Sequence, residues 1–207
     1  MPDKNNNIPS PGSLPENYQE VLYWTIREIP RRALLLQVLS IPLFVLSVLV
    51  FFGLAVSLGK LPSRLTFGLG EIVVIVIAIL LTIVLHELTH GIAMQRFGAT
   101  PRYGVLWVQA MFYATAPGYA FRRNDYIQIA LAPLIVLSVL GVLGMWLASG
   151  TFWVAAFAIG AVINASGAIG DLWVTSIVLR YPDIAYVMDE KDGIRVFLST
   201  GAHRSRL

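Results

Sequence analysis

The sequence predicts an all-α polytopic membrane protein with four transmembrane helices and a small cytoplasmic β-hairpin loop after the second. Of its 207 residues, 57% are hydrophobic and only 13% are charged, and its mean hydropathy is +0.71. Soluble domains carry about a quarter charged residues. The apolar residues here gather in four long runs, and about 20 such residues suffice to cross a bilayer as a helix. Composition and patterning therefore both indicate a membrane protein.

The region up to residue 32 is expected to be a cytoplasmic N-terminal tail. Residues 1–15 are rich in Pro, Asn and Ser, which predicts disorder. Residues 16–30 would gather apolar side chains on one side of a helix, so we expect either a helix lying on the membrane surface or a short cytosolic helix packed on the rest. That apolar side is formed by Val21, Leu22, Ile26 and Ile29.

A membrane domain of four spans is expected over residues 33–180. The spans are 33–58, 69–96, 126–148 and 152–179. The connection around Ser149 and Gly150 is very short, so the third and fourth spans should form an antiparallel hairpin. Trp146 and Trp153 flank that turn, where aromatic side chains at a membrane interface are expected.

The basic residues predict the orientation of these spans. Lys60 and Arg64 alone fall on one side of the four-span arrangement, and the other thirteen fall on the opposite side. Those thirteen are Lys4, Arg27, Arg31, Arg32, Arg96, Arg102, Arg122, Arg123, Arg180, Lys191, Arg195, Arg204 and Arg206. By the positive-inside rule, both termini and the 97–125 loop should be cytoplasmic in a multi-pass protein of the cell membrane. No basic stripe is interleaved with aromatics, so we set nucleic acid aside as a partner.

Two segments outside the spans carry strand and turn signals. The 97–125 loop is rich in strand-forming residues and has a turn signal at Ala116-Pro117-Gly118, which favours a β-hairpin against the membrane face over a plain interfacial loop. The C-terminal tail, 181–207, is expected to form a second hairpin with Asp192-Gly193 as its turn. Cysteine is absent, which excludes disulfides and thiolate metal sites.

The second span contains the segment His86-Glu87-Leu88-Thr89-His90. Residues four apart lie on one face of a helix, so both imidazoles can reach the same ion. Glu87 projects from the adjoining flank, where it can hold and deprotonate a water on the metal. Zinc lowers the pKa of such a water to about 7. The segment therefore predicts a zinc site with His86 and His90 as ligands and Glu87 as the catalytic base.

The membrane setting strengthens this interpretation. An ionisable side chain at mid-membrane costs on the order of 2.5–3.5 kcal/mol on insertion scales, so such residues usually have a function or a partner. The alternative is a metal-free polar cluster that holds the helices together. Ser, Thr or Asn would supply that interaction at lower cost.

Catalytic zinc generally has a third protein ligand, and position along the chain separates the candidates. Glu71 lies about 22 Å before His86 along the same helix and cannot fold back. Asp125 lies at the membrane boundary, where ordinary charge pairing explains it. His203 lies in a polar tail and would need an unusual route to the metal.

Asp171 is the sole acidic residue inside the fourth span. His86 lies about 15 Å before the basic exit at Arg96, and Asp171 lies about 13–14 Å before the exit at Arg180. Both spans leave on the same side, so the two groups lie at matching depth. We therefore expect Asp171 to be the third metal ligand. The alternative is a carboxylate that supports a ligand or pairs two helices.

Two further residues are placed near this site. Asn164 lies seven residues before Asp171 on the same face, where it would bind substrate, orient a ligand or make an interhelical hydrogen bond. The small residues between them allow close approach of helix backbones. Pro133 is expected to kink the third span beside the site, or to have a purely structural effect.

With these residues placed, the chain resembles the site-2 protease class of intramembrane zinc metalloproteases, and it is similar to a family of small membrane proteins named putative zincin peptidases. The likeness covers roughly the last three spans and the loop after the second. The class has a His-Glu-x-x-His helix, a following cytoplasmic hairpin and a later helix that gives an aspartate ligand. Here these correspond to residues 86–90, 103–121 and Asp171.

The chain also departs from that class. The usual Asn-x-x-Pro approach and Asp-Gly pair are missing, and Asn164-Ala-Ser-Gly167 and Asp171-Leu172 stand in their place. Without the proline, the fourth span is expected to be less broken near the metal.

The resulting prediction is a membrane-embedded zinc metalloprotease, with a catalytic core over 69–180, that hydrolyses peptide bonds in or near the cytoplasmic side of the membrane. Zinc is the expected cofactor, and membrane lipid and a peptide or membrane-protein substrate are the expected partners. The alternative is a non-catalytic membrane scaffold or regulator with a structural metal or a polar cluster. A transporter is a third option, although four spans without repeats are few unless the protein oligomerises.

Overall fold

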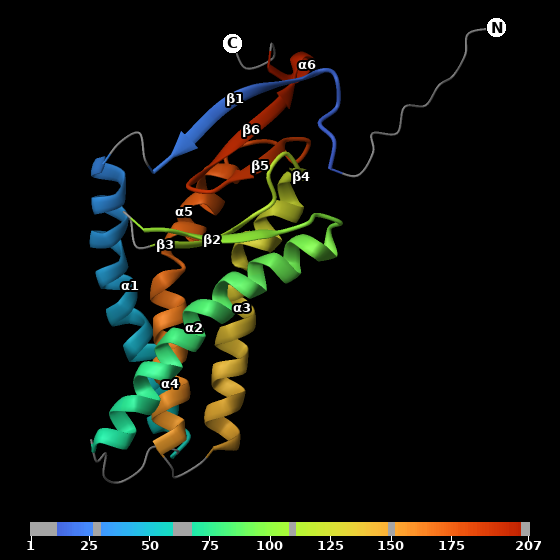
Figure 1. Cartoon of the computed structure of the whole chain (residues 1–207). Helices are drawn as coiled ribbons and strands as arrows, with labels where there is room; N and C mark the ends of the chain where they lie inside the picture. The colour runs from blue at the N-terminus through green and yellow to red at the C-terminus, as the bar shows by residue number, and fades with distance from the viewer. Residues whose placement is uncertain (1–11, 27–29, 60–67, 108–110, 149–151, 204–207) are drawn as a thin grey trace, which may run out of the picture.

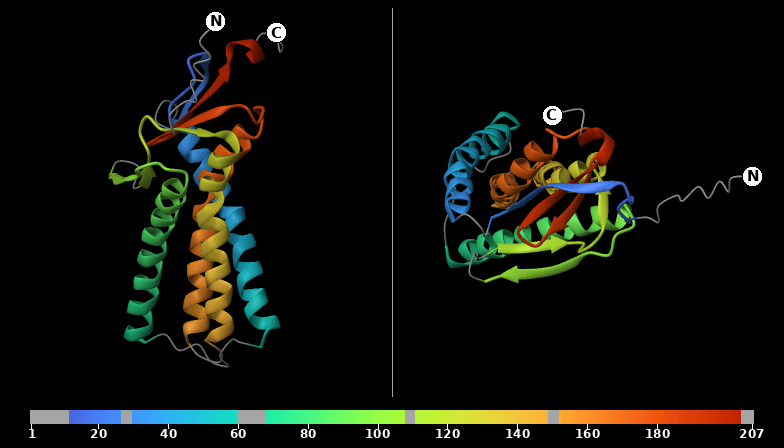
Figure 2. Two further views of the ribbon diagram at one scale, coloured as in Figure 1. Left: turned by 90° about the vertical axis from the view of Figure 1, so that its right-hand side faces the viewer. Right: turned by 90° about the horizontal axis from the view of Figure 1, so that it is seen from above.

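The computed structural model describes residues 12–26, 30–59, 68–107, 111–148 and 152–203. Within them, four helical segments are long and apolar enough to cross a membrane. They are α1 (Pro30–Ser57), α2 (Leu69–Arg96), α3 (Arg123–Leu147) and the pair α4 (Phe152–Gly167) and α5 (Ile169–Val178). The helices stand side by side with a sheet over one end, as Figures 1 and 2 show. Four apolar helices are therefore confirmed within a few residues of the expected bounds.

Close packing of α3 against α4 explains the density of small residues in this hairpin. A methyl group placed at Gly141 would lie 2.9 Å from Cβ of Ala161, and one placed at Gly144 would overlap the ring of Phe157. Glycine at both positions lets the helices approach to backbone contact. α4 also packs against α1 and α2, so it is the central helix of the bundle.

The fourth span has a single-residue interruption at Ala168, between α4 and α5. The amide of Ala168 still donates to the carbonyl of Asn164 (3.1 Å), and the amide of Leu172 donates to Ala168 (2.9 Å). The helix axis therefore continues through the interruption, as expected for a span without the proline.

The expected helix over 16–30 is wrong. Tyr18–Thr25 form a strand, β1, which pairs antiparallel with β6 (Gly193–Ser199) in a register that sets Tyr18 opposite Ser199 and Thr25 opposite Gly193. The segment YQEVLYWT is rich in aromatic and β-branched residues that favour strands. Its pairing partner, β6, lies near the other end of the chain. The periodicity of a short window therefore could not predict that this segment is a strand. Ile29 and residues 1–11, most of the expected disordered tail, lie outside the described residues.

The all-α class is also too narrow, because four strands form one sheet. The order is β1-β6-β5-β4, where β5 is Tyr186–Glu190 and β4 is Ala120–Arg122. A separate two-stranded hairpin joins β2 (Arg102–Leu106) to β3 (Met111–Thr115), which confirms the hairpin expected after the second span. A short helix, α6 (Thr200–His203), follows β6.

The expected C-terminal hairpin is present, but its glycine has a different role. β5 and β6 are joined through Lys191 and Asp192, and Gly193 is already the first residue of β6. A methyl group at Gly193 would lie 2.0 Å from the carbonyl oxygen of Trp24. Glycine is needed there because β1 approaches the backbone closely.

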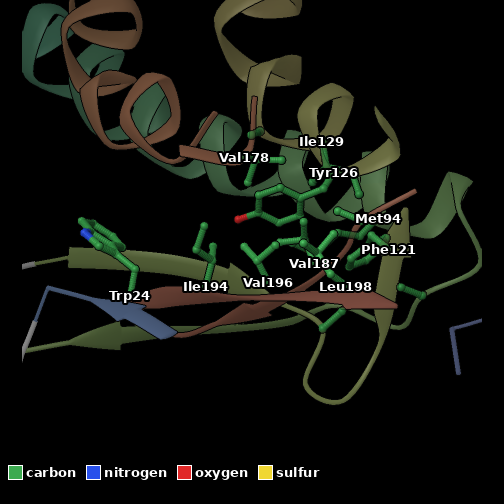
Figure 3. Close-up of a cluster of buried hydrophobic side chains, with 14 of the residues drawn as sticks. Trp24, Met94, Phe121, Tyr126, Ile129, Val178, Val187, Ile194, Val196 and Leu198 are labelled. Atoms are coloured by element: carbon green, nitrogen blue, oxygen red, sulfur yellow. The ribbon is translucent and has the colours of Figure 1, made fainter. Parts of the chain in front are cut away.

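The sheet packs its inner face against one end of the helix bundle, and a continuous apolar core fills the junction (Figure 3). Fully buried strand residues such as Val187, Ile194 and Val196 meet Ile129 of α3 and Val178 of α5. This core holds the ends of α2, α3 and α5 in place, and those are the helices that carry the predicted site.

Candidate metal centre

Side chains from α2 and α5 converge as predicted. The Nε2 atom of His86 lies 3.1 Å from Oδ2 of Asp171, and Nε2 of His90 lies 3.3 Å from Oδ1 of the same carboxylate. One ligand atom from each of the three residues lies within 4.8 Å of the others. Their side chains are only 11–19% exposed. The structure thus brings together the three residues that were predicted from the sequence to be metal ligands.

Asp171 reaches the histidines because of how α5 is held. It lies in the first turn of α5, just after the interruption at Ala168. At the other end of the helix, the guanidinium group of Arg123 donates to the carbonyl oxygens of Val178 (3.4 Å) and Leu179 (3.2 Å). A cation at a helix C-terminus satisfies carbonyls that have no partner within the helix. Arg123 therefore ties the end of α5 to the start of α3.

Asn164 orients His86. Its Nδ2 atom donates to the carbonyl oxygen of Pro133 (3.1 Å), so its Oδ1 atom is the one that faces Nδ1 of His86, at 3.0 Å. Because an amide oxygen only accepts hydrogen bonds, Nδ1 of His86 carries the proton. Asn164 is almost completely buried, at 2% exposed. It both orients a histidine and makes an interhelical hydrogen bond, so it has both of the structural roles that the sequence suggested.

His90 is oriented through a different acceptor. Its Nδ1 atom lies 3.0 Å from the carbonyl oxygen of Ile129 on α3. Ile129 precedes Pro133 by four residues, and proline has no N–H to bond the carbonyl one turn earlier. Pro133 therefore leaves the Ile129 carbonyl free to accept from His90. The proline is part of the site's construction, a role that its sequence position alone did not show.

These donors fit a zinc ion. The Nδ1 atom of each histidine faces an acceptor and therefore carries the proton, which leaves a lone pair on each Nε2 atom for a metal. Two imidazoles and a carboxylate are a usual ligand set for catalytic zinc. Ligand atoms about 2.1 Å from a tetrahedral zinc ion lie about 3.4 Å from one another. The observed separations of 3.1 and 3.3 Å are close to that spacing.

Glu87 lies beside this cluster and does not join it. Glu87, His90 and Asp171 all line one cavity of about 140 Å³. Phe112, Tyr113 and Ala114 of β3 line it as well. The hairpin after the second span thus forms a wall of the cavity in which the glutamate lies.

Asp189, which was not predicted from the sequence, also lines this cavity. It lies on β5, and its Oδ1 atom accepts a hydrogen bond from the hydroxyl of Tyr126 (2.8 Å). Burial raises the pKa of Asp189 to about 7, against the opposing effect of the hydrogen bond from Tyr126. No local motif marks this aspartate. The only available signal was an acidic residue on the apolar side of an expected strand.

The rejected ligand candidates stay apart from the cluster. Glu71 lies in the first turn of α2 and Asp125 in the first turn of α3, and neither belongs to the group of convergent ligand atoms. The side chain of His203 lies outside the described residues.

Comparisons with known proteins agree with this geometry. A family model described as "putative zincin peptidase" matches residues 79–186, a range that contains His86, Glu87, His90 and Asp171. An uncharacterised 24.7 kDa protein of Pyrococcus woesei, described as lying in the gap 5′ region, is 29% identical over 120 residues. The match covers 56% of this chain and 51% of that protein, so the chain spans about half the length of this relative. No solved structure matches the chain.

Proposed function

Because the chain belongs to the putative zincin peptidase family, we propose that it is a membrane-embedded zinc metallopeptidase of the site-2 protease type. The observation that carries the proposal is the convergence of His86, His90 and Asp171, with Glu87 lining the same cavity as His90 and Asp171. His86, His90 and Asp171 would hold zinc. Glu87 is the catalytic base.

A bound zinc ion would activate water at neutral pH and polarise the carbonyl of the substrate peptide bond. Glu87 takes the proton of the attacking water as the new C–O bond forms. It then delivers that proton to the amide nitrogen as the C–N bond breaks, which completes the hydrolysis. Asn164 and Ile129 keep each histidine in the tautomer that presents Nε2.

The proposed setting is a cell membrane with both termini in the cytoplasm. Four apolar helices support insertion. The start of α1, the end of α2, the start of α3 and the end of α5 lie on the side of the sheet (Figure 1). Arg31, Arg96, Arg123 and Arg180 lie at these ends or within two residues of them in the sequence. The cavity lies between the helices and this sheet. Peptide bonds in or near the cytoplasmic side of the membrane are therefore the proposed substrates, in a peptide or a membrane protein.

The contacts themselves favour one rival. Distances of 3.1 and 3.3 Å between imidazole nitrogens and the Asp171 carboxylate also suit ion pairs of protonated histidines. In that case the cluster would hold α2 against α5 without metal, as a scaffold or regulator would use it.

Metal content and cleavage separate the two functions. We expect roughly one zinc per chain in wild type purified in detergent without chelators, and loss of zinc in His86→Ala and Asp171→Ala. Glu87→Gln should keep zinc and lose peptide cleavage. Glu71→Gln, on the same helix outside the cluster, is the matched control and should keep both. A folded wild type that neither contains nor takes up zinc would favour the scaffold.

A further inference from the structure

Asp189 interrupts an apolar surface. Side chains alternate along β5, so Asp189 lies on the same face as Val187, which is completely buried in the core under the sheet. The neighbouring residues of β6 on that face, Ile194 and Val196, are also completely buried. A carboxylate on such a face is costly unless it has a partner or a function.

The partners of Asp189 in the described part of the chain are neutral. Tyr126 donates to its carboxylate at 2.8 Å, and the Thr115 hydroxyl donates to its backbone carbonyl at 3.2 Å. The structure shows no ion pair for it among the described residues. On the outer face of the same sheet, by contrast, Arg195 pairs with Glu190 (2.9 Å) and Glu20 (3.6 Å).

The basic residue nearest to Asp189 along the chain contacts a different side chain of the cavity. The ammonium group of Lys191 lies 6.0 Å from the ring centroid of Tyr113 on β3, in a cation–π contact. Among the contacts of the described residues, Asp189 therefore keeps acceptor capacity on its carboxylate, and the residue lines the cavity.

The cavity has the character of a site for a cation on an apolar stem. Among the described residues that line it, Lys191 is basic and five are acidic, of which Glu190 is already paired with Arg195. The other four are Glu87, Asp171, Asp189 and Asp192. Trp24, Phe112 and Val174 give the wall apolar surface, along which the methylene groups of a lysine or arginine side chain could pack.

We propose that Asp189 is a specificity-determining residue that binds a cationic nitrogen of the substrate while the peptide bond lies at Glu87. This inference rests on the proposed peptidase function and names the substrate class: peptides with a positive charge close to the cleaved bond. The cation would come from a lysine or arginine side chain or from a free amino terminus, which share the same chemistry.

The shape of the site explains why such a preference would be strong. A charge-assisted hydrogen bond in a partly enclosed cavity is stronger than a neutral one. A neutral isosteric ligand offers Asp189 no such bond, and the carboxyl group then keeps only the hydrogen bond from Tyr126. We expect a cationic peptide to bind at least about tenfold more tightly than its neutral counterpart.

Peptide binding tests the proposal without depending on turnover. The zinc-loaded Glu87→Gln protein is titrated into short fluorescent alanine-rich peptides with blocked termini, in which one lysine is moved along the chain. Matched peptides carry norleucine at the same places. A third set has a free amino terminus and no lysine. Fluorescence anisotropy should show the tenfold preference for lysine at one position, or for the free amino terminus, and the responding set identifies the source of the cation.

A second substitution assigns the preference to Asp189. Asn keeps an oxygen for Tyr126, so Asp189→Asn in the Glu87→Gln background should keep the fold and zinc and bind cationic and norleucine peptides equally. Asp183→Asn, an exposed acid just before β5, controls for net charge and should leave the preference intact. Equal binding of all peptide sets before the second substitution, or a preference that survives Asp189→Asn, would overturn the proposal.

A different result would contradict the proposed peptidase function. If the protein with its native Glu87 binds the cationic peptides through Asp189 and cleaves none of them, the cation site stands and the proteolytic function does not. Cleavage without any cation preference would give the reverse conclusion.

Discussion

The Nδ1 atom of His90 lies 3.0 Å from the carbonyl oxygen of Ile129, on a neighbouring helix 39 residues away. That carbonyl is available because Pro133, four residues later, has no amide hydrogen to donate to it. A helix-breaking residue in α3 thus sets the orientation of a proposed zinc ligand in α2. Removing the hydrogen-bond partner of a metal-binding histidine typically lowers metal affinity 10- to 100-fold.

Replacing Pro133 with alanine should weaken zinc binding about tenfold. The new amide would donate to the Ile129 carbonyl and compete with His90 for the same acceptor. Zinc affinity would be measured by competition with a chromogenic chelator in detergent. Pro42→Ala, at an exposed position inside α1, is the matched control and should leave affinity unchanged. Unaltered affinity in Pro133→Ala would mean that the His90 bond does not depend on the proline.

Replacing Asn164 with alanine should lower both stability and zinc affinity. The change leaves the Pro133 carbonyl and Nδ1 of His86 without their partners in a buried setting, at a cost of about 1–3 kcal/mol for each unsatisfied group. Thermal unfolding of the zinc-free protein would report the first effect, and chelator competition would report the second. Ser166→Ala, which removes only a local bond to the Ile163 carbonyl, should change neither by much. A fully stable Asn164→Ala protein would contradict this account.

The Asp189→Asn variant should become more stable than wild type as the pH rises. The pKa of Asp189 is about 7 in the folded protein and about 3.9 in an unfolded chain. Between these values the unfolded state has lost a proton that the folded state keeps, so wild-type stability falls with rising pH until the group is ionised in both states. Asparagine does not titrate. The stability difference should therefore widen between about pH 5 and pH 8, by about 1–3 kcal/mol after allowance for solvent in the cavity.

That pH effect would be measured on the zinc-free protein, with Asp183→Asn as the reference. His90, Tyr126 and Asp171 also act on the pKa of Asp189 and are common to both proteins. The other titratable groups that line the cavity are likewise common to both: they are Glu87, Tyr113, Glu190, Lys191 and Asp192. A difference between Asp189→Asn and wild type that stays constant with pH would show that this carboxyl ionises normally.

Replacing Gly193 with alanine should destabilise the protein by several kcal/mol or prevent folding of the sheet. Its methyl group would lie 2.0 Å from the Trp24 carbonyl and 2.7 Å from Cα of Thr25, and both are backbone atoms that cannot turn aside. Gly201→Ala, where nothing lies within 4 Å of the new methyl group, should be neutral. Thermal unfolding and limited proteolysis of the tail would detect the difference. Equal stability of the two variants would contradict the β1–β6 pairing.

Much of the bundle and of the cluster could be predicted because it depends on local or one-dimensional information. Runs of apolar residues determine helices in a membrane, and the spacing of His86 and His90 places both on one face of α2. Asp171 was found by counting residues from each basic exit, which works because helix rise is constant. The contact of 3.1 Å between His86 and Asp171 agrees with that count.

The remaining features follow from contacts between distant segments. β1 is a strand because β6 pairs with it, from more than 160 residues away, and a short amphipathic window cannot distinguish this from a helix. Asn164 and Ile129 orient the histidines only once α3 and α4 are packed against α2.

The sequence alone thus determined which helices form and which side chains could meet at one depth, since both follow from the order of residues along each helix. The tertiary structure decided what surrounds the three proposed ligands: the freed Ile129 carbonyl, the β3 wall beside Glu87, and Asp189 in the cavity. Hydrogen-bond partners and cavity walls come from separate elements. Their identity depends on how those elements pack, and no local pattern in the chain encodes it.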